Sequence, residues 1–327
     1  MDVSLTALVS LPILLVAGLL FALPTPGCAE ASPPSLPEGN TGLAARYPGD
    51  AGIGDDPAAV FHADFEDCRT VADLSKRWNV MYNPEHLSIT EDAANVNGGQ
   101  RALEITMPRQ ESPLSVDVGN DLAKSYDMLF LRFYTKFQEG FAVPRTPMHN
   151  GGSMSAGYYP GGKATPGQRA DGRNKFLASL ETSAWRLESP GPLMVYLYHP
   201  EQRDRYGDQM FPTGQIIPNL EAPHNFGAHF LARPDVVPER GRWYCFEYML
   251  KANTPGQRDG RVACWVDGKV IADFPNLRLR DVESLKIDRF SIGLYIGDNR
   301  LRENKKWYDD VVVATSYIGP RFDSGQE

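Results

Sequence analysis

The chain has 327 residues, of which 42% are hydrophobic and 23% are charged, and its formal net charge is -8. This composition is typical of a globular protein with a full-sized core, and the length fits one large all-β domain or two small ones. The negative charge argues against nucleic acid or an anionic membrane surface as a partner, because both attract clustered positive charge.

The first residues indicate export. Residues 5–23 form an apolar run broken only by small residues, two hydroxyl side chains and Pro12, and Ala29-Glu30-Ala31 follows as a small-x-small cleavage site. We therefore predict a signal peptide over 1–31 and a secreted or periplasmic protein with no membrane contact after cleavage. The length of the run leaves a membrane anchor as an alternative, and Cys28 leaves a lipid anchor.

After the predicted signal, residues 32–59 are rich in Pro, Gly, Ala and Asp and predict an extended lead-in. The folded domain is expected over 60–320, with a short tail over 321–327. Residues 71–78 suggest one short helix. The remaining periodic segments predict strands over 60–66, 102–107, 128–137, 176–181, 193–198, 243–251, 261–265, 289–296 and 308–316.

Turn signals separate these strands. Residues 253–260 read as a hairpin loop, and residues 265–269 as a tight turn. Many short strands without a strand-helix-strand rhythm predict an all-β, two-sheet antiparallel β-sandwich, one face of which can hold an extended ligand. We expect a monomer.

Cleavage would leave three cysteines, Cys68, Cys245 and Cys264, in an oxidising compartment. Cys245 and Cys264 lie in consecutive strands, so a cross-strand disulfide and buried thiols are both open.

Several motifs occur in an order that resembles the secreted polysaccharide lyases of family 14. They are Asp64-Phe-Glu66, Gly140-Phe141, a glycine-rich basic loop, Tyr196-Leu-Tyr198, Asn253-Thr-Pro-Gly256, Trp265-Val-Asp-Gly268 and Tyr308-Asp-Asp-Val311. The resemblance spans about residues 60–320. It implies a concanavalin-like jelly roll that cleaves acidic polysaccharides.

In that family a Lys in the glycine-rich loop, a Ser-x-Arg and a Tyr-x-Tyr form the site. Tyr196 and Tyr198 match the tyrosine pair. Ser179-Leu-Glu181 lies where Ser-x-Arg is expected, so Glu181 replaces the arginine. His149 or Lys163 must stand in for the lysine. The departures leave the identity of the sugar open.

Strand alternation places Tyr196 and Tyr198 on one face of their strand, and Ser179 and Glu181 on one face of the strand before it. A β-eliminating lyase needs a base, an acid and a partner for the uronate carboxylate. We predict Tyr198 as the acid, or as the base if ionised, with Tyr196 beside it. The alternative is that both tyrosines are structural or stack on sugar.

His149 lies in Pro147-Met-His-Asn-Gly-Gly152, a setting that favours a working histidine, either as the base or, when charged, as a carboxylate partner. Residues 132–175 hold seven Lys and Arg residues against two acidic ones, which is typical of a polyanion site, although a solvated loop explains it too. Arg145 and Lys163 are the predicted carboxylate partners. Further predicted substrate contacts are Asn150, Ser179 and Glu181.

Acidic residues near the first and last strands suggest a structural Ca²⁺ site made by Glu66, Asn97 and Asp309, with no organic cofactor. The alternative is that these acids simply face water.

We therefore expect a polysaccharide lyase that cleaves an acidic, uronate-containing polysaccharide by β-elimination. The main rival is a non-catalytic carbohydrate-binding module, which needs no base. A glycoside hydrolase ranks third, because it needs two carboxyl groups about 5 to 9.5 Å apart and only Glu181 with Glu188 suggests such a pair.

Overall fold

The computed structural model describes residues 1–2, 35–184, 189–218, 226–227 and 229–322. The predicted signal peptide therefore lies almost wholly outside the described residues. Contacts group Pro34–Glu327 into one compact unit. Among the described residues, no helix is both long enough and apolar enough to cross a bilayer.

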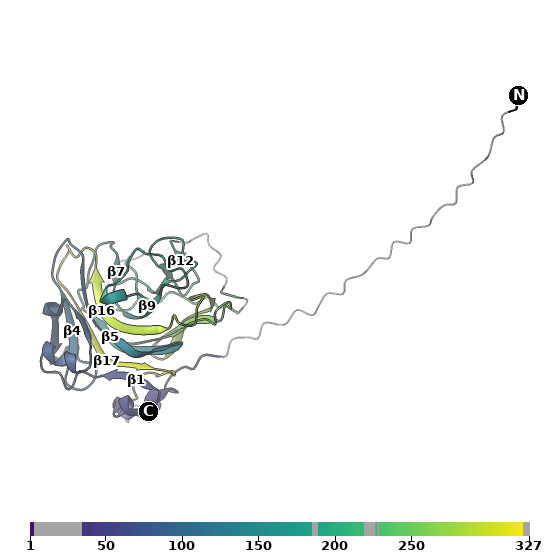
Figure 1. The fold of residues 1–327 in the computed structure, drawn as a ribbon. Helices are drawn as coiled ribbons and strands as arrows, with labels where there is room; N and C mark the ends of the chain where they lie inside the picture. The colour runs from purple at the N-terminus through teal and green to yellow at the C-terminus, as the bar shows by residue number, and fades with distance from the viewer. Residues whose placement is uncertain (3–34, 185–188, 219–225, 228, 323–327) are drawn as a thin grey trace. The chain divides into compact units, whose positions relative to one another are not determined.

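The described strands form two antiparallel sheets, which lie as two layers in Figure 1. Sheet 1 runs in the order β15 (Lys269–Leu277), β14 (Gly260–Val266), β13 (Trp243–Lys251), β6 (Met128–Phe137), β17 (Asn304–Ala314), β4 (Ala102–Met107) and β3 (Leu87–Thr90), with β1 (Ala59–Ala63) on β17. Sheet 2 runs in the order β12 (Ile216–Ile217), β11 (Asp208–Met210), β10 (Leu193–Tyr198), β9 (Phe176–Thr182), β8 (Gly152–Ala156), β16 (Ile287–Ile296), β5 (Leu114–Tyr126) and β2 (Val80–Tyr82), with β7 (Met148–His149) on β16.

These sheets confirm the predicted two-sheet antiparallel sandwich. Each predicted strand has a counterpart; the bounds of β4, β6, β10 and β13 are as predicted, and those of the other five differ by a few residues. The largest omission was β5, whose second half is polar and partly exposed, so it lacks the apolar alternation that identifies a strand. The described helical turns are all of the 3-10 type: η1 (Leu43–Arg46), η2 (Pro48–Asp50), η3 (Ile53–Asp55), η4 (Val71–Lys76), η5 (Pro84–His86), η6 (Ala93–Asn95) and η7 (Pro160–Gly162). The predicted helix corresponds to η4, which starts with a capping box between Thr70 and Asp73.

The main core fills the space between the sheets and contains the inward side chains of alternate strand positions. Val195, Leu197, Ala178 and Leu180 belong to it, as the predicted alternation requires. The opposite side chains of β9 and β10 are therefore directed away from this core.

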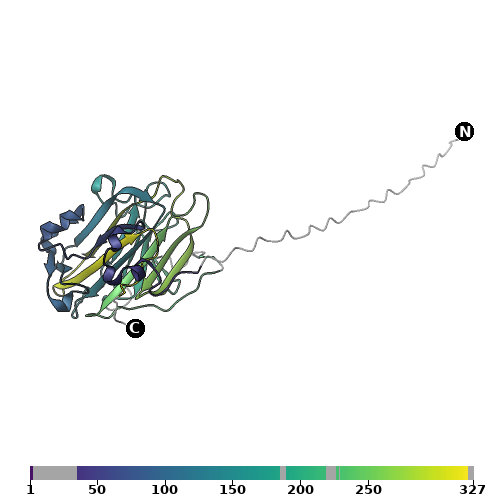
Figure 2. The same ribbon diagram turned by 90° about the horizontal axis from the view of Figure 1, so that it is seen from below.

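A second cluster lies on the outer face of sheet 1 and corrects the prediction for residues 32–59. We expected an extended lead-in, but residues 43–55 contain η1, η2 and η3, and Leu43 and Ile53 are buried against Trp265 and Ile318. Figure 2 shows these purple turns lying across the strands of the sheet. The turns form because this segment carries enough apolar side chains to cover a sheet face.

One buried ion pair ties this segment to sheet 1. Arg132 on β6 is fully buried, and its guanidinium bonds the carboxylate of Asp50 in η2, with Nη1 3.2 Å from Oδ1. The same guanidinium donates to the carbonyl oxygens of Asp310 and Gly319, at 3.1 and 3.3 Å. Arg132 thus joins the N-terminal turns to the last strand and the segment after it.

The three cysteines described are free and buried. Cys264 pairs in register with Tyr248, three positions along β13 from Cys245. An odd separation places the two side chains on opposite faces of the sheet, so the sandwich keeps them as separate thiols rather than as a disulfide.

Two of the predicted calcium ligands bind the turn that contains the third. The carboxylate of Asp309 accepts from the backbone N–H groups of Asn97 and Gly98, at 2.9 and 3.1 Å. Glu66 Oε1 accepts from the N–H groups of Gln100 and Arg101, at 2.8 Å each. No group of three or more His, Cys, Asp or Glu side chains within the described part of the chain is placed to hold a metal ion.

Calcium at this turn stays a prediction, and chelation tests it. An ion bound only by the folded state raises Tm by mass action, so EDTA should lower Tm and added Ca²⁺ should restore it. A Tm that neither reagent changes would mean that hydrogen bonds alone hold the turn.

The Arg132–Asp50 pair predicts a large loss of stability in Asp50→Ala. Removing one partner leaves a buried guanidinium without its counter-charge, which costs about 3–5 kcal/mol of unfolding free energy. Denaturant unfolding measures this loss. Asp55→Ala, which changes an exposed acid in the next turn, is the matched control and should stay within about 0.5 kcal/mol of the parent. A parental stability for Asp50→Ala would contradict the assigned role.

Candidate functional site

The outward face of β9 and β10 carries the polar side chains that were predicted to share a site. Tyr196 pairs in register with Ser179, and Met194 pairs with Glu181. Ser179 in turn pairs with Ser153 of β8, and Ser153 pairs with Ser291 of β16. We call this side of sheet 2, opposite to the core, the polar face.

His149 belongs to this face although it comes from a different segment. It forms β7 with Met148 and pairs with Tyr295 of β16. Its ring centroid lies 4.7 Å from that of Tyr196 and 5.5 Å from that of Tyr295. The His149 side chain is 44% exposed, so the imidazole is open to a ligand.

A buried carboxylate holds the inner side of this imidazole. His149 Nδ1 lies 2.8 Å from Oε1 of Glu181, whose side chain is 1% exposed. Ser179 Oγ lies 2.8 Å from the other carboxylate oxygen. Because a carboxylate only accepts hydrogen bonds, Nδ1 carries the proton and the neutral ring presents Nε2 as an acceptor.

The same contact sets the titration of His149. Burial by itself lowers the pKa of His149, but the negative charge of Glu181 and the hydrogen bond to it outweigh burial, and the pKa is raised above its usual 6.5. Glu181 was predicted to contact substrate. Its carboxylate instead bonds His149 and Ser179 below the surface.

The two tyrosines of β10 occupy different environments. Tyr196 is half-buried next to His149, and its hydroxyl accepts from the N–H of Gly207 at 3.0 Å. Burial, above all, raises the pKa of Tyr196, so its hydroxyl stays protonated at neutral pH. Tyr198 is fully buried, and its hydroxyl accepts from the N–H of Gly167 at 3.2 Å.

Lys175, which the sequence reasoning did not select, packs against Tyr198. Its Nζ lies 4.6 Å from the ring centroid of Tyr198 and 4.7 Å from that of Tyr158, and it donates to Thr165 Oγ1 at 3.0 Å. Burial lowers the pKa of Lys175 to about 8. Extending the alternation of Ser179 and Glu181 back by four residues would have placed Lys175 on the same face.

The polar face continues onto β16 and β5, where the sequence reasoning named no site residue. Arg289 is buried, and its guanidinium lies 3.7 Å from the ring centroid of Tyr159 and 3.3 Å from the carboxylate of Asp121. Asp117 lies on the same face, and burial raises its pKa to about 6. A carboxyl group whose pKa is raised toward neutral pH is a frequent feature of functional sites.

The remaining predicted contacts do not share the hydrogen bonds of this group. Asn150 is fully buried, and its amide bonds the backbone and hydroxyl of Thr182, so it fastens the break between β7 and β8. Arg145 and Lys163 are exposed in the loops before β7 and after β8. Of the proposed acid pair for a hydrolase, Glu188 lies outside the described residues.

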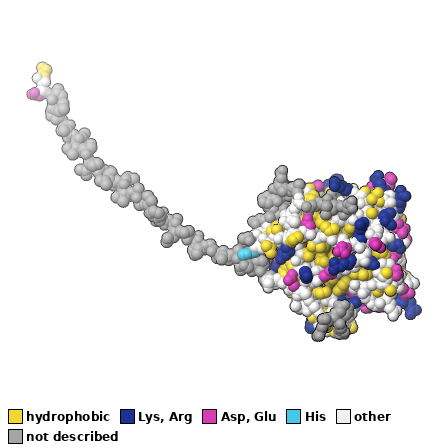
Figure 3. Space-filling model, turned by 180° about the vertical axis from the view of Figure 1, so that it is seen from behind, with side chains coloured by type: hydrophobic (Ala, Val, Ile, Leu, Met, Phe, Trp, Pro, Cys, Tyr) yellow, Lys and Arg dark blue, Asp and Glu magenta, His cyan; other side chains and the backbone are white. Residues whose placement is uncertain are grey.

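The basic segment 132–175 is less exposed than its charge suggested. Arg132, Lys136 and Lys175 are buried, while Arg145, Lys163, Arg169 and Arg173 are exposed. Figure 3 shows the side of the molecule that faces away from the viewer in Figure 1, and there Lys and Arg are interspersed with Asp and Glu. The charge count alone therefore overstated the positive surface.

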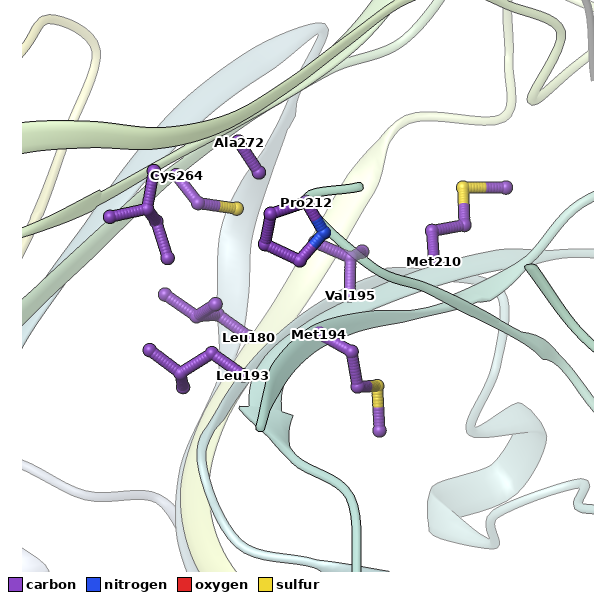
Figure 4. A pocket seen from close by; sticks show the side chains of 9 residues that line it. Leu180, Leu193, Met194, Val195, Met210, Pro212, Cys264 and Ala272 are labelled. Carbon is purple, nitrogen blue, oxygen red and sulfur yellow. The ribbon is translucent and has the colours of Figure 1, made fainter. Parts of the chain in front are cut away.

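The pocket drawn in Figure 4 is separate from the polar face. It is lined by Leu180, Val195, Met210, Cys264 and other apolar side chains from both sheets. Without charged or hydroxyl groups, this lining suits packing rather than acid–base chemistry.

No protein-family model matches the sequence, and no curated protein sequence matches it either. Solved structures do match the fold. The alginate lyase Aly36B is 16% identical with a TM-score of 0.56, over 80% of this chain and 98% of that chain. The alginate lyase vAL-1 from Chlorella virus is 15% identical with a TM-score of 0.53, over 79% of this chain and 99% of that one.

A marine PL-14 alginate lyase from Aplysia kurodai is 14% identical with a TM-score of 0.50, over 79% of this chain and 97% of that chain. At these identities the likeness concerns the fold. The predicted jelly-roll sandwich is therefore confirmed, and this chain shares its architecture with solved alginate lyases.

Proposed function

We propose that this protein is a polysaccharide lyase that cleaves a uronate-containing polysaccharide by β-elimination. The observation that carries the proposal is the part-exposed imidazole of His149, held by the buried Glu181 beside Tyr196. The fold adds support, because structures of Aly36B variants hold an alginate trisaccharide and an alginate tetrasaccharide.

The reaction needs three groups on one sugar ring. A base removes the proton from C5, the electrons form the double bond between C4 and C5, and the bond from C4 to O4 breaks as an acid protonates the leaving oxygen. A cation or hydrogen-bond donor stabilises the carboxylate during proton removal.

His149 is the proposed base. Its Nδ1 is engaged by Glu181, so the neutral ring has its lone pair on Nε2. The carboxylate below stabilises the imidazolium that forms when Nε2 takes the C5 proton. The exposed side of the ring gives a polymer access without rearrangement of the sheet.

Tyr196 is the proposed acid. It lies against His149 and keeps its phenolic proton at neutral pH, because its pKa is raised. Tyr198 was our first choice from the sequence, and it stays a prediction. In the structure its buried hydroxyl lies on the side of Lys175 and Tyr158, so a substrate must displace covering residues to reach it.

Arg145 is the proposed carboxylate partner, since it is exposed and lies four residues before His149. Lys163 is the second candidate.

Export of the mature chain from Ser32 stays part of this proposal, and N-terminal sequencing of protein from a secreting host tests it.

A carbohydrate-binding module is the alternative function. It would use the aromatic side chains Tyr196 and Tyr295, which lie beside His149, as a stacking surface and would not need the imidazole. The buried pairing of His149 with Glu181 favours the enzyme, because stacking alone does not require a histidine held in one tautomer.

The first experiment measures ultraviolet absorbance of the unsaturated product on alginate, glucuronan and other polyuronates. His149→Ala and Tyr196→Phe should each lower kcat by ~100-fold or more, the scale of general acid–base catalysis. Arg145→Ala should raise KM more than it lowers kcat.

Tyr82→Phe is the matched control, since it removes an exposed hydroxyl from β2 at the edge of sheet 2. It should keep parental kinetics. If the parent gives no unsaturated product on any polyuronate but still binds them, the binding module replaces the lyase. Near-parental rates in both His149→Ala and Tyr196→Phe would remove these two residues from the mechanism.

The pH profile gives a second prediction. A histidine base works only when neutral, so kcat/KM should rise with pH through the raised pKa of His149, above 6.5. Glu181→Gln removes the charge that raises this pKa, so the rising limb should move to lower pH while the maximal rate falls. A limb that stays in place in Glu181→Gln would exclude His149 as the titrating group.

A further inference from the structure

A lysine of sheet 1 contacts the backbone of this site from the core side of sheet 2. Lys306 lies on β17 of sheet 1 and is fully buried. Its Nζ donates to the carbonyl oxygen of Asn150, the residue after His149. Figure 1 shows β17 in one layer and β7 and β9 in the other, so this contact crosses the sandwich.

The contact falls where sheet 2 is interrupted. Asn150 and Gly151 separate β7 from β8, and a Cβ on Gly151 would lie 1.8 Å from the carbonyl oxygen of Leu180. Only glycine allows this close approach of the backbone to β9. The hydroxyl of Tyr308 also lies 3.0 Å from the Asn150 carbonyl.

The surroundings of Lys306 Nζ are those of a buried cation. Nζ lies 4.0 Å from the ring centroid of Phe137 and 5.0 Å from that of Tyr308. Burial lowers the pKa of Lys306 well below its usual value, and the negative charge of Glu181 opposes this effect.

Two basic groups of the described structure are influenced by the charge of Glu181, namely His149 and Lys306. Glu181 contacts His149 and Ser179 on its own sheet, and its charge acts on Lys306 and Tyr308 of β17, on Tyr248 of β13 and on Tyr158 after β8. The other neighbours of His149 are Tyr196 of β10 and Tyr295 of β16. Phenols are uncharged at neutral pH, so these tyrosines do not compensate the charge of Glu181 as the lysine and the histidine can.

We propose that Lys306 is a positioning residue that acts from the opposite sheet: its Nζ holds the carbonyl of Asn150, the residue after His149, and places a buried positive charge beneath the His149–Glu181 pair. Glu181 fixes the tautomer of His149. The positive charge of Lys306 disfavours a second positive charge on the His149 ring, so the ring can release the proton that it accepts as a base. This role rests on the proposed lyase function, but the underlying charge coupling does not.

An NMR titration of the His149 ring tests the coupling without any need for activity. Lys306→Met keeps the length of the side chain and removes the charge, so the pKa of His149 should rise, because loss of a nearby positive charge favours protonation. The resonance is assigned with His149→Asn.

Two variants separate charge from structure. Lys305→Met alters the next residue, whose Nζ bonds Glu104 on the outer face at 2.6 Å, and it should leave the pKa of His149 unchanged. Tyr308→Phe removes the other group near the Asn150 carbonyl without removing a charge, and it should shift the pKa less than Lys306→Met does.

Thermal unfolding gives a second measurement that does not depend on the NMR assignment. Glu181→Gln leaves a buried cation without its counter-charge, so its Tm should fall, and adding Lys306→Met should recover part of that loss. A pKa of His149 that is unchanged in Lys306→Met would overturn the proposal, and so would additive Tm losses in the double variant. A coupled pair in a protein without lyase activity would instead contradict only the proposed function.

Discussion

The candidate site depends on one constraint, which is that the carboxylate of Glu181 is buried and must be compensated. A buried charge without partners is costly, and Glu181 has hydrogen bonds to His149 and Ser179 and the field of Lys306. Those partners fix the imidazole in one orientation and one tautomer. The cost of burying the acid is therefore linked directly to the tautomer of His149, the property on which its proposed role as a base depends.

The same constraint distinguishes the site from the pattern of the lyase family that the sequence resembles. Where that family has an arginine, this chain has Glu181, whose carboxylate bonds His149 and Ser179 below the surface. In the proposed lyase, the positive charge that a uronate requires would come from outside the sheet floor, from loop residues such as Arg145 or from the imidazolium itself. A site of this kind can be tuned by pH more strongly than one that contains a permanent guanidinium.

Strand alternation accounts for most of what the sequence could predict. The pairs Tyr196/Tyr198 and Ser179/Glu181 were placed on one face from periodicity alone, and the register of β9 and β10 puts them there. His149 was selected for its glycine-rich setting, but its contact with Glu181 joins segments 32 residues apart. Pairing between distant strands is not encoded in local periodicity, and the same limit hid Lys306, which lies on the other sheet. Lys175 was missed for another reason, because the alternation of Ser179 and Glu181 was not extended back along the chain to it.

The opposite placement of Lys305 and Lys306 shows what alternation alone leaves unresolved. Adjacent strand residues face opposite sides, so one of the two lysines had to point into the core, and a lysine is a poor core residue. Chemistry alone would place both at the surface. The chain instead keeps Lys306 between the sheets, where it reduces stability through desolvation but acts on a carboxylate in the other sheet. Sequences break a local rule of this kind most often at functional sites, and that makes the inward lysine of β17 an argument for a working site at His149 that is independent of the resemblance in fold.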